Sequence, residues 1–264
     1  MATRARLDAE LVRRGLARSR EHAAELIEAG RVRVGKQVAT KSATAVEPAT
    51  ALLVDQEEGE QWVSRGAHKL LGALEAFGVD PTGRRALDAG ASTGGFTQVL
   101  LRRGAREVVA ADVGYGQLAW SLRTDERVTI LDRTNVRALE LEQIGEPVDL
   151  VVADLSFIPL GLVLPALLRC ATPGADLLPM VKPQFEVGKE RLPAGGVVRD
   201  PALRAWAVQQ VADQALGLGL GVAGVVASPL PGPNGNVEFF LHLRVGAPPL
   251  VEADLARAIS EGPA

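Results

Sequence analysis

Four charged side chains lie next to predicted apolar elements in a way that suits proton-transfer chemistry. Lys69 is on the first turn of a predicted helix, and Glu238 opens the last predicted strand. Asp154 and Lys182 each come directly after an apolar strand, where burial of a charge is costly unless it is paired. Any one of the four could simply reach solvent. Because two of them end strands of one predicted sheet, facing the same glycine-rich loop, we expect the four to form one site.

The glycine-rich loop belongs to the segment Arg84–Gly104, which reads RRALDAGASTGGFTQVLLRRG. It predicts a strand closed by Asp88, a tight loop and the helix Phe96–Leu101, the kind of βα corner where open parallel sheets bind ligands. The loop does not fit G-x-G-x-x-G, and no lysine follows to complete a phosphate-binding loop. It therefore suits a ligand with a carboxylate and a ribose, such as S-adenosylmethionine (SAM). An ordinary turn that uses glycine for positive φ is the alternative.

Two further polar positions extend this candidate ligand site. Asp112 ends the second predicted strand, 24 residues after Asp88, and an acid at this position is placed to hold ribose hydroxyls. Asp132 or Asn135, after the third strand, could meet an adenine edge, although either could simply make a turn.

The elements that would position these residues alternate between apolar runs and helical stretches, which predicts a doubly wound sheet. A final hairpin pairs Val222–Ala227 with Val237–Leu243. The other expected strands are Val108–Ala111, Val128–Leu131, Val148–Ala153 and Leu177–Val181, and the other expected helices are Ala67–Phe77 and Pro201–Leu218.

Composition restricts the class of protein. At 264 residues the chain can form one sizeable α/β domain plus a small appendage. No apolar run approaches the length of a membrane span and Met1–Leu11 is charged, so we expect a soluble, non-exported, cytoplasmic chain. The single Cys170 excludes an internal disulfide, and three scattered histidines argue against a metal site.

Charge is distributed unevenly along the chain. Residues 1–44 carry ten Lys/Arg against five Asp/Glu, a net charge of +5, whereas the remaining residues carry 19 against 27, a net charge of −8. A basic head on an acidic body predicts an anionic partner at one end. Six arginines fall within residues 4–20, and they could form a solvated face or a phosphate-binding surface. They are Arg4, Arg6, Arg13, Arg14, Arg18 and Arg20.

The head is predicted to contain helices at Leu7–Gly15 and Ser19–Gly30 and strands at Val32–Val34 and Ala51–Val54. Its pattern, RLDAELVRRGLARSREHAAELIEAGRVRVGKQVATKSATAV, resembles an S4 RNA-binding domain over about 50 residues. We therefore divide the chain into an S4-like domain at 1–59, a linker at 60–66 and a body at 67–264.

The body resembles the FtsJ-like ribose 2′-O-methyltransferases, whose tetrad runs Lys, Asp, Lys, Glu in the order found here. With the S4-like head, the strings ALDAGASTGGFT, ADVGYGQLAW, ADLSFI, VKPQFEVGK and SPLPGPNGNVEFF resemble the TlyA (hemolysin A) family over essentially the whole chain. This resemblance implies a Rossmann-like SAM-dependent methyltransferase with a mostly parallel sheet. It also implies 2′-O-methylation of cytidine in 16S or 23S rRNA, with ribosomal subunits as partners. We expect a monomer.

The resemblance also implies roles for individual residues. Lys69, Asp154, Lys182 and Glu238 would be catalytic. The residues expected to hold the cofactor are Asp88, Gly90, Ala91, Ser92, Thr93, Gly94, Gly95, Phe96, Asp112, Asn135 and Asp154. Those expected to contact RNA are Arg4, Arg6, Arg14, Arg18, Arg20, Lys41, Arg65, Tyr115, Arg133 and Phe157. One departure is that similar family members have Arg-x-Trp-Val between the domains, where this chain has Glu60-Gln61-Trp62-Val63.

Physical reasoning favours the same chemistry. A ribose 2′-hydroxyl is a poor nucleophile, so catalysis needs in-line positioning and a group that accepts or stabilises its proton. Methylation of a base amine would instead suit an Asn/Asp-Pro-Pro-aromatic string, which Asp154-Leu155-Ser156-Phe157 is not. Phe157 and Tyr115 would stack a flipped-out nucleotide or merely anchor their loops. Two alternative hypotheses are an RNA-binding protein with an inactive body and a membrane-active cytolysin.

Overall fold

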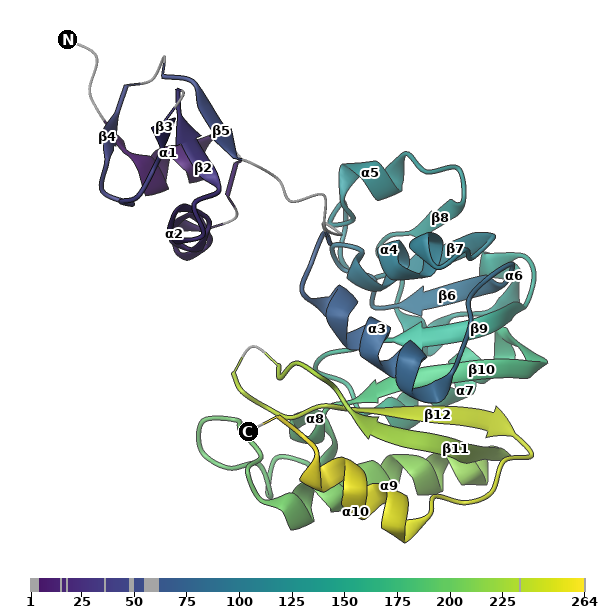
Figure 1. Ribbon diagram of the computed structural model, residues 1–264. Helices are drawn as coiled ribbons and strands as arrows, with labels where there is room; N and C mark the ends of the chain where they lie inside the picture. The colour runs from purple at the N-terminus through teal and green to yellow at the C-terminus, as the bar shows by residue number, and fades with distance from the viewer. Residues whose placement is uncertain are drawn as a thin grey trace. The chain divides into compact units, whose positions relative to one another are not determined.

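The computed structural model describes residues 5–14, 16–17, 19–35, 37–47, 50–54, 62–232 and 234–263. They form two compact units, Met1–Gln61 and Trp62–Ala264, which we call the head and the body (Figure 1). Four positions discussed above, Arg4, Arg18, Glu60 and Gln61, lie outside the described residues.

The head packs two helices against short strands. Its helices are α1 (Leu7–Arg13) and α2 (Arg20–Glu28). Its strands are β1 (Ala5–Arg6), β2 (Val32–Val34), β3 (Gln37–Val38), β4 (Ala45–Val46) and β5 (Leu52–Val54). Strands β3, β2 and β5 form one antiparallel sheet and β1 pairs with β4. The predicted N-cap of the second helix is confirmed, because the Ser19 side chain accepts a hydrogen bond from His22 N at 3.1 Å.

The body is built on a seven-stranded sheet of order β11-β12-β10-β9-β6-β7-β8 (Figure 1). Its strands are β6 (Arg85–Ala89), β7 (Glu107–Ala111), β8 (Val128–Leu131), β9 (Val148–Ala153), β10 (Ala171–Val181), β11 (Leu220–Ala227) and β12 (Phe239–Val245). Strands β8, β7, β6, β9 and β10 are parallel, and β12 runs antiparallel to both of its neighbours. The predicted α/β class and the terminal antiparallel hairpin are therefore confirmed.

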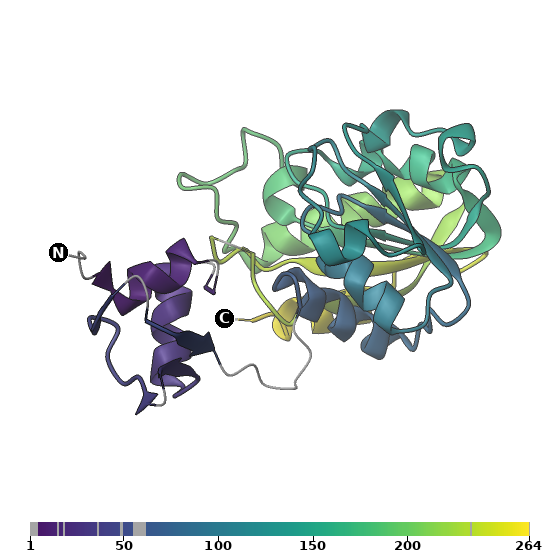
Figure 2. The ribbon, with the colours of Figure 1, turned by 90° about the horizontal axis from the view of Figure 1, so that it is seen from above.

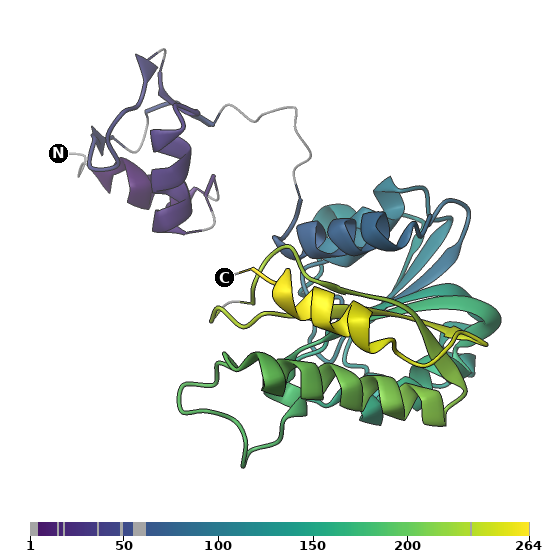
Figure 3. The ribbon, with the colours of Figure 1, turned by 60° about the horizontal axis from the view of Figure 1, so that its bottom comes forward.

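Helices cover both faces of the sheet (Figures 2 and 3). The helices are α3 (Gly66–Phe77), α4 (Gly95–Arg102), α5 (Trp120–Arg123), α6 (Leu141–Ile144), α7 (Leu164–Arg169), α8 (Pro183–Glu186), α9 (Pro201–Gly217) and α10 (Glu252–Ser260). Side chains along β9 alternate between the two faces of the sheet. Leu150 and Val152 pack in the core with residues of α3 and α4, whereas Val151 and Ala153 pack in the core with residues of α7, α9 and α10. Two short 3-10 turns are η1 (Val136–Ala138) and η2 (Leu160–Leu162).

The fifth strand of the body is longer than predicted, since β10 begins at Ala171 rather than at Leu177. Its first half contains Pro173 and Gly174, which weaken the strand pattern in the sequence, and a register shift against β9 accommodates them. Asp176, in this half, is buried between Arg84 Nη1 at 2.5 Å and His242 Nε2 at 2.7 Å. Burial raises the pKa of Asp176, but the hydrogen bonds from Arg84 and His242 outweigh burial and keep it below its ordinary value.

Candidate active site

The carboxyl ends of β9 and β10 bring Asp154 and Lys182 together, as predicted from the pairing of these strands. Asp154 Oδ1 lies 2.6 Å from Lys182 Nζ, and Lys182 Nζ donates a hydrogen bond to Ser156 Oγ at 2.9 Å. Lys182 has the extended backbone expected of a residue before proline, with φ −111° and ψ 101°. Its side chain is 9% exposed, so the ammonium group is held in a fixed, largely dry position.

The other two members of the predicted tetrad form a second buried pair. Lys69 Nζ, from the first turn of α3, lies 2.5 Å from Glu238 Oε2, and Glu238 is 1% exposed. Glu238 directly precedes β12, and the register Val181↔Phe239 sets it opposite Lys182 one residue further along. Two lysines and two carboxylates thus occupy one sheet edge, and pairing offsets the cost of burying them.

The loop before β12 holds Glu238 from several sides. Ser228 N donates to the Glu238 carbonyl at 2.7 Å, and a Cβ on Gly232 would lie 2.7 Å from Glu238 Oε1. Two residues before Glu238, the Asn236 amide accepts from Val198 N and donates to the Gly196 carbonyl, both at 2.9 Å. These bonds tie the loop that carries Glu238 to the α8–α9 loop, which follows Lys182. Asn236 and Ser156 were not predicted from the sequence, because short polar residues in loops carry no signal of their own.

The glycine-rich loop follows β6 and lies beside this cluster. Gly90 has φ 88°, and a Cβ there would lie 2.6 Å from the Asp154 carbonyl. Gly94 has φ 96°, and its Cβ would lie 2.2 Å from Leu122 Cδ1. Both positions therefore require glycine. Of the other predicted loop residues, Ser92 and Thr93 are exposed at the tip, whereas Ala91, Gly95 and Phe96 are buried.

Asp112 lies at the end of β7 and holds the loop in place. Its Oδ2 accepts a hydrogen bond from Ser92 N at 2.8 Å, and its Oδ1 accepts from Gly114 N at 2.7 Å. Val113, the next residue, is 70% exposed although it is apolar. The carboxylate and the neighbouring apolar surface therefore lie at the sheet edge beside the glycine-rich loop, where a ribose and a flat ring could bind.

Asp88 ends β6 in a fully buried position. Its Oδ2 accepts a hydrogen bond from Thr97 Oγ1 at 2.6 Å, whereas its Oδ1 has no hydrogen-bond partner among the described residues. Burial, with a smaller contribution from the nearby carboxylates of Asp154 and Asp112, raises the pKa of Asp88 to about 7 against the opposing Thr97 hydrogen bond. A buried acceptor that lacks a partner at this edge suits the cationic end of a ligand.

Asp132 and Asn135 make local turn contacts. Asn135 Oδ1 accepts from Arg137 N at 3.1 Å and caps η1, while Asp132 Oδ2 accepts from Gly116 N at 3.2 Å and lies 3.3 Å from Arg123 Nη1. Contact with an adenine stays a prediction for both residues.

Three exposed aromatic rings follow β7 or β9 in the chain. Phe157 is 90% exposed, has φ 65° and lies 5.0 Å from the Phe185 ring, measured between centroids. Tyr115 is 67% exposed, with the Arg133 guanidinium carbon 4.3 Å from its ring centroid. Trp120, which the sequence did not single out, is 76% exposed. Backbone strain at Phe157, like that at Arg133 and Ser92, is typical of functional loops.

The first residues of the body pack on α4, the helix that the glycine-rich loop opens. Arg102 lies over the Trp62 ring at 4.5 Å, and Val63 N donates to Gln98 Oε1 at 2.8 Å. Ser64 Oγ would lie 2.2 Å from a Cβ on Gly95. The Trp-Val pair at the domain joint therefore supports the helix that begins at the glycine-rich loop.

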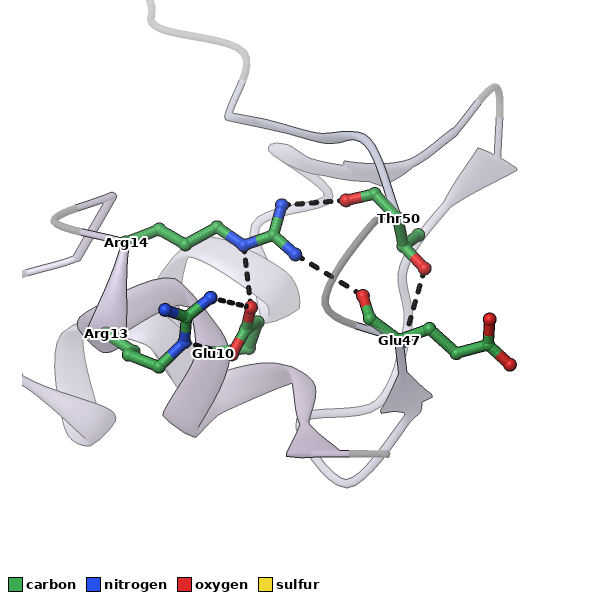
Figure 4. A network of polar contacts seen from close by, with 5 residues as sticks. All are labelled: Glu10, Arg13, Arg14, Glu47 and Thr50. Carbon is green, nitrogen blue, oxygen red and sulfur yellow. Dashed lines mark hydrogen bonds and ion pairs between the residues drawn. The ribbon is translucent and has the colours of Figure 1, made fainter. Parts of the chain in front are cut away.

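The head arginines fall into two sets. Glu10 is buried and pairs with Arg13 Nη2 at 2.6 Å and with Arg14 Nε at 2.7 Å (Figure 4). Arg14 also donates to the carbonyls of Thr50, at 2.7 Å, and Glu47, at 3.4 Å, so its whole guanidinium is engaged within the head. Of the other predicted RNA contacts, Arg6 and Arg20 pair with Asp8, and Lys41 and Arg65 are exposed. Contact of Arg14 with RNA stays a prediction that this arrangement does not favour.

Two other features are absent from the part of the chain that the structure describes. None of its helices is long and apolar enough to cross a membrane. Its histidines, cysteine and carboxylates form no group of three or more that could hold a metal ion.

The strand order reverses at β6, which has β7 on one side and β9 on the other, and the glycine-rich loop lies at this switch point. With the antiparallel β12 inserted beside β10, this arrangement defines an α/β methyltransferase. Family models for an FtsJ-like methyltransferase and for an S4 domain match residues 62–245 and 5–51, respectively.

Known proteins give a consistent picture. The chain is 64% identical to the 16S/23S rRNA (cytidine-2′-O)-methyltransferase TlyA of Mycobacterium tuberculosis, with full coverage of both chains. It is 32% identical to hemolysin A of Brachyspira hyodysenteriae, covering 90% of this chain and 98% of that one. A solved structure of a proposed hemolysin from Streptococcus thermophilus superposes with a TM-score of 0.76 at 34% identity, covering 99% of this chain and 96% of that one. The chain belongs to the FtsJ-like methyltransferases and, among them, to the TlyA (hemolysin A) family.

Proposed function

We propose that this enzyme transfers a methyl group from SAM to the ribose 2′-hydroxyl of a cytidine in rRNA. The observation that carries the proposal is the pair of buried lysine–carboxylate contacts, Lys182–Asp154 and Lys69–Glu238, beside a glycine-rich loop at one sheet edge. The name of the Mycobacterium tuberculosis relative supports the substrate, 16S or 23S rRNA. Such a substrate implies ribosomal subunits as partners and a cytoplasmic location.

The residues beside the glycine-rich loop fit SAM in three respects. Asp88 Oδ1, which has no hydrogen-bond partner among the described residues, suits the ammonium group of the methionine part, and Asp112 suits the ribose hydroxyls. The exposed Val113 offers an apolar surface for the adenine ring. Gly90 and Gly94 let the loop backbone pack closely against Asp154 and Leu122, which positions the loop beside these groups. When bound, SAM supplies a methyl group already activated by its sulfonium.

With the methyl group activated, the residues of this chain have to orient the 2′-hydroxyl and manage its proton. Lys182 is fixed by Asp154 and Ser156, so its Nζ is available at a defined point of the sheet edge. As a neutral amine it would accept the hydroxyl proton, and as an ammonium group it would stabilise the negative charge that develops on the oxygen. Glu238, opposite Lys182 in the sheet register, is paired with Lys69, and this second pair would orient the hydroxyl together with Lys182.

The substrate must also be extracted from folded RNA. Phe157 and Tyr115 are exposed rings on loops that follow β9 and β7, and a flipped-out nucleotide gains stacking energy on such rings. Arg133, stacked on Tyr115, adds a positive charge for a neighbouring phosphate. The basic head and Arg65 would contribute phosphate contacts and therefore affinity rather than chemistry.

A direct test is methyl transfer from isotopically labelled SAM to ribosomal subunits that lack the modification, followed by nucleoside mass spectrometry. The proposal predicts label in 2′-O-methylcytidine and none in the bases, with Lys69→Met as the inactive control. Label on a base, or equal labelling by the control, would contradict it.

A further inference from the structure

The head contains a buried carboxylate that holds two exposed guanidinium groups. Asp8 is 4% exposed, whereas the side chains of Arg6 and Arg20 are 52% and 60% exposed. Arg6 donates through Nε to Asp8 Oδ1 at 3.1 Å and through Nη2 to Asp8 Oδ2 at 3.0 Å. Arg20 donates through Nη2 to the same Oδ2, also at 3.0 Å. One oxygen therefore fixes both guanidinium groups side by side.

The carboxylate is itself rigidly placed. Asp8 N donates to the Ser42 carbonyl at 3.1 Å, and Ala9 N donates to Asp8 Oδ1 at 2.8 Å. The hydrogen bond from Arg6 is the main reason that the pKa of Asp8 lies well below its ordinary value, in spite of burial. Asp8 therefore stays ionised at neutral pH. It joins Arg6, which ends β1, to Arg20, which begins α2.

Both arginines keep donors that Asp8 does not use. Among the described residues, Arg6 donates through Nε and Nη2, which leaves the two N–H groups of its Nη1, and Arg20 donates through Nη2 only. Arg14 differs, because Glu10 and two carbonyls take up its nitrogens and its side chain is 22% exposed. The Asp8 cluster thus presents exposed charge, whereas the Arg14 contacts tie the end of α1 to Glu47 and Thr50.

We propose that Asp8 is a positioning residue that presents Arg6 and Arg20 as one preorganised double-arginine site for an RNA phosphate. Free arginine side chains lose rotamer freedom when they bind, and a binding site whose side chains are already ordered avoids that loss. The inference deepens the proposed function, since it rests on the head binding rRNA. A carboxylate beside the binding site would otherwise only repel the phosphate.

The direction in which RNA affinity changes therefore distinguishes the two effects of Asp8. Removing a negative charge from an RNA-binding surface should tighten binding if only the net field matters. Removing the charge that orders two arginines should weaken binding. Asp8→Asn is nearly isosteric and keeps an oxygen to accept from Ala9 N, so it separates the two effects. Glu28→Gln is the matched control, because Glu28 is exposed on α2 and loses the same charge.

The experiment measures binding of the full chain to radiolabelled 23S rRNA transcript by filter retention at several salt concentrations. We expect Asp8→Asn to weaken binding about fivefold, the order expected from ordering two long side chains. We expect Glu28→Gln to tighten binding slightly. Tighter binding by Asp8→Asn would overturn the inference. Failure of the unchanged chain to bind rRNA would instead overturn the proposed function.

Repeating Asp8→Asn in a protein that lacks Arg6 and Arg20 distinguishes the positioning role of Asp8 from a purely structural one. In an Arg6→Ala/Arg20→Ala background, the inference predicts that Asp8→Asn no longer weakens binding and tightens it slightly, whereas misfolding would weaken it in both backgrounds. If Asp8→Asn unfolds the head, as judged by circular dichroism, Asp8→Glu serves instead. It keeps the charge but moves the carboxylate by one methylene, and binding equal to that of the unchanged chain would overturn the inference.

Discussion

Replacing Asp88 by asparagine should make the protein more stable at alkaline pH and less able to bind its methyl donor. Asp88 is fully buried, with Oδ2 on Thr97 and Oδ1 without a partner among the described residues. Asparagine has nearly the same shape and can still accept the Thr97 hydrogen bond, but it carries no charge. The burial of Asp88 thus has two effects: it destabilises the fold when the carboxylate is charged, and it leaves an acceptor for a cationic ligand.

The magnitude follows from the pKa of Asp88, which burial raises to about 7, against about 3.9 in an unfolded chain. Between these values the unfolded chain gives up the proton and the folded chain keeps it, so stability falls as pH rises and levels off above pH 7. From pH 5 to pH 8 the loss amounts to about 3 kcal/mol, at about 1.4 kcal/mol for each pH unit up to the folded pKa. Asparagine at this position removes this loss.

Thermal unfolding of both proteins at pH 5 and pH 8, without ligand, measures the effect. The advantage of Asp88→Asn should grow by about 8 °C between the two conditions, since 1 kcal/mol shifts the Tm of a domain of this size by about 2–4 °C. Calorimetric SAM affinity should rise with pH through 7 for the unchanged protein, and be weaker and pH-independent for Asp88→Asn. A Tm difference that does not change with pH would refute the reasoning about the buried carboxylate.

Three other changes test separate parts of the site. Gly94→Ala places a Cβ against Leu122 at positive φ, so SAM affinity should fall at least tenfold, as measured by calorimetry; unchanged affinity would show that the loop tolerates the methyl group. Asp112→Ala removes the acceptor of Ser92 N and should also weaken SAM binding, whereas unchanged affinity would remove Asp112 from the site. Phe157→Ala should abolish methylation of ribosomal subunits while the Tm stays unchanged, because the ring is 90% exposed; near-normal turnover would leave Phe157 only a loop anchor.

The elements that position the site could be predicted from the sequence because each has a strong local signal. Val148–Ala153 is continuously apolar, as expected of a central parallel strand, and the structure gives the same bounds. The charged residues directly after such strands had to meet at one edge, so Asp154 and Lys182 could be placed together. The pairing of Lys69 with Glu238 followed only from the family resemblance, since no local pattern joins a helix to a strand 169 residues away.

Features that depend on packing between distant parts of the chain could not be predicted from local sequence patterns. Ala171–Asp176 contains a proline and a glycine, and it is part of a strand because its two ends pair with β9. The head arginines form one cluster in the sequence, but among the described residues two buried carboxylates divide them, because Glu10 pairs with Arg13 and Arg14 and Asp8 pairs with Arg6 and Arg20. Burial of Asp8 and Glu10 could not be inferred from a helix that otherwise looks charged and solvated.

The central claim is that the Lys182 amino group takes part in methyl transfer. We predict that Lys182→Ala keeps its Tm, its SAM affinity and its ribosome binding, but loses single-turnover methyl transfer to ribosomal subunits by about 10²-fold or more. Lys182→Arg separates proton acceptance from electrostatic positioning, because a guanidinium does not give up its proton near neutral pH. Loss of transfer in both variants is the result expected if Lys182 accepts the proton, and a near-normal rate in Lys182→Arg would leave only positioning. Near-normal transfer by Lys182→Ala would contradict the account.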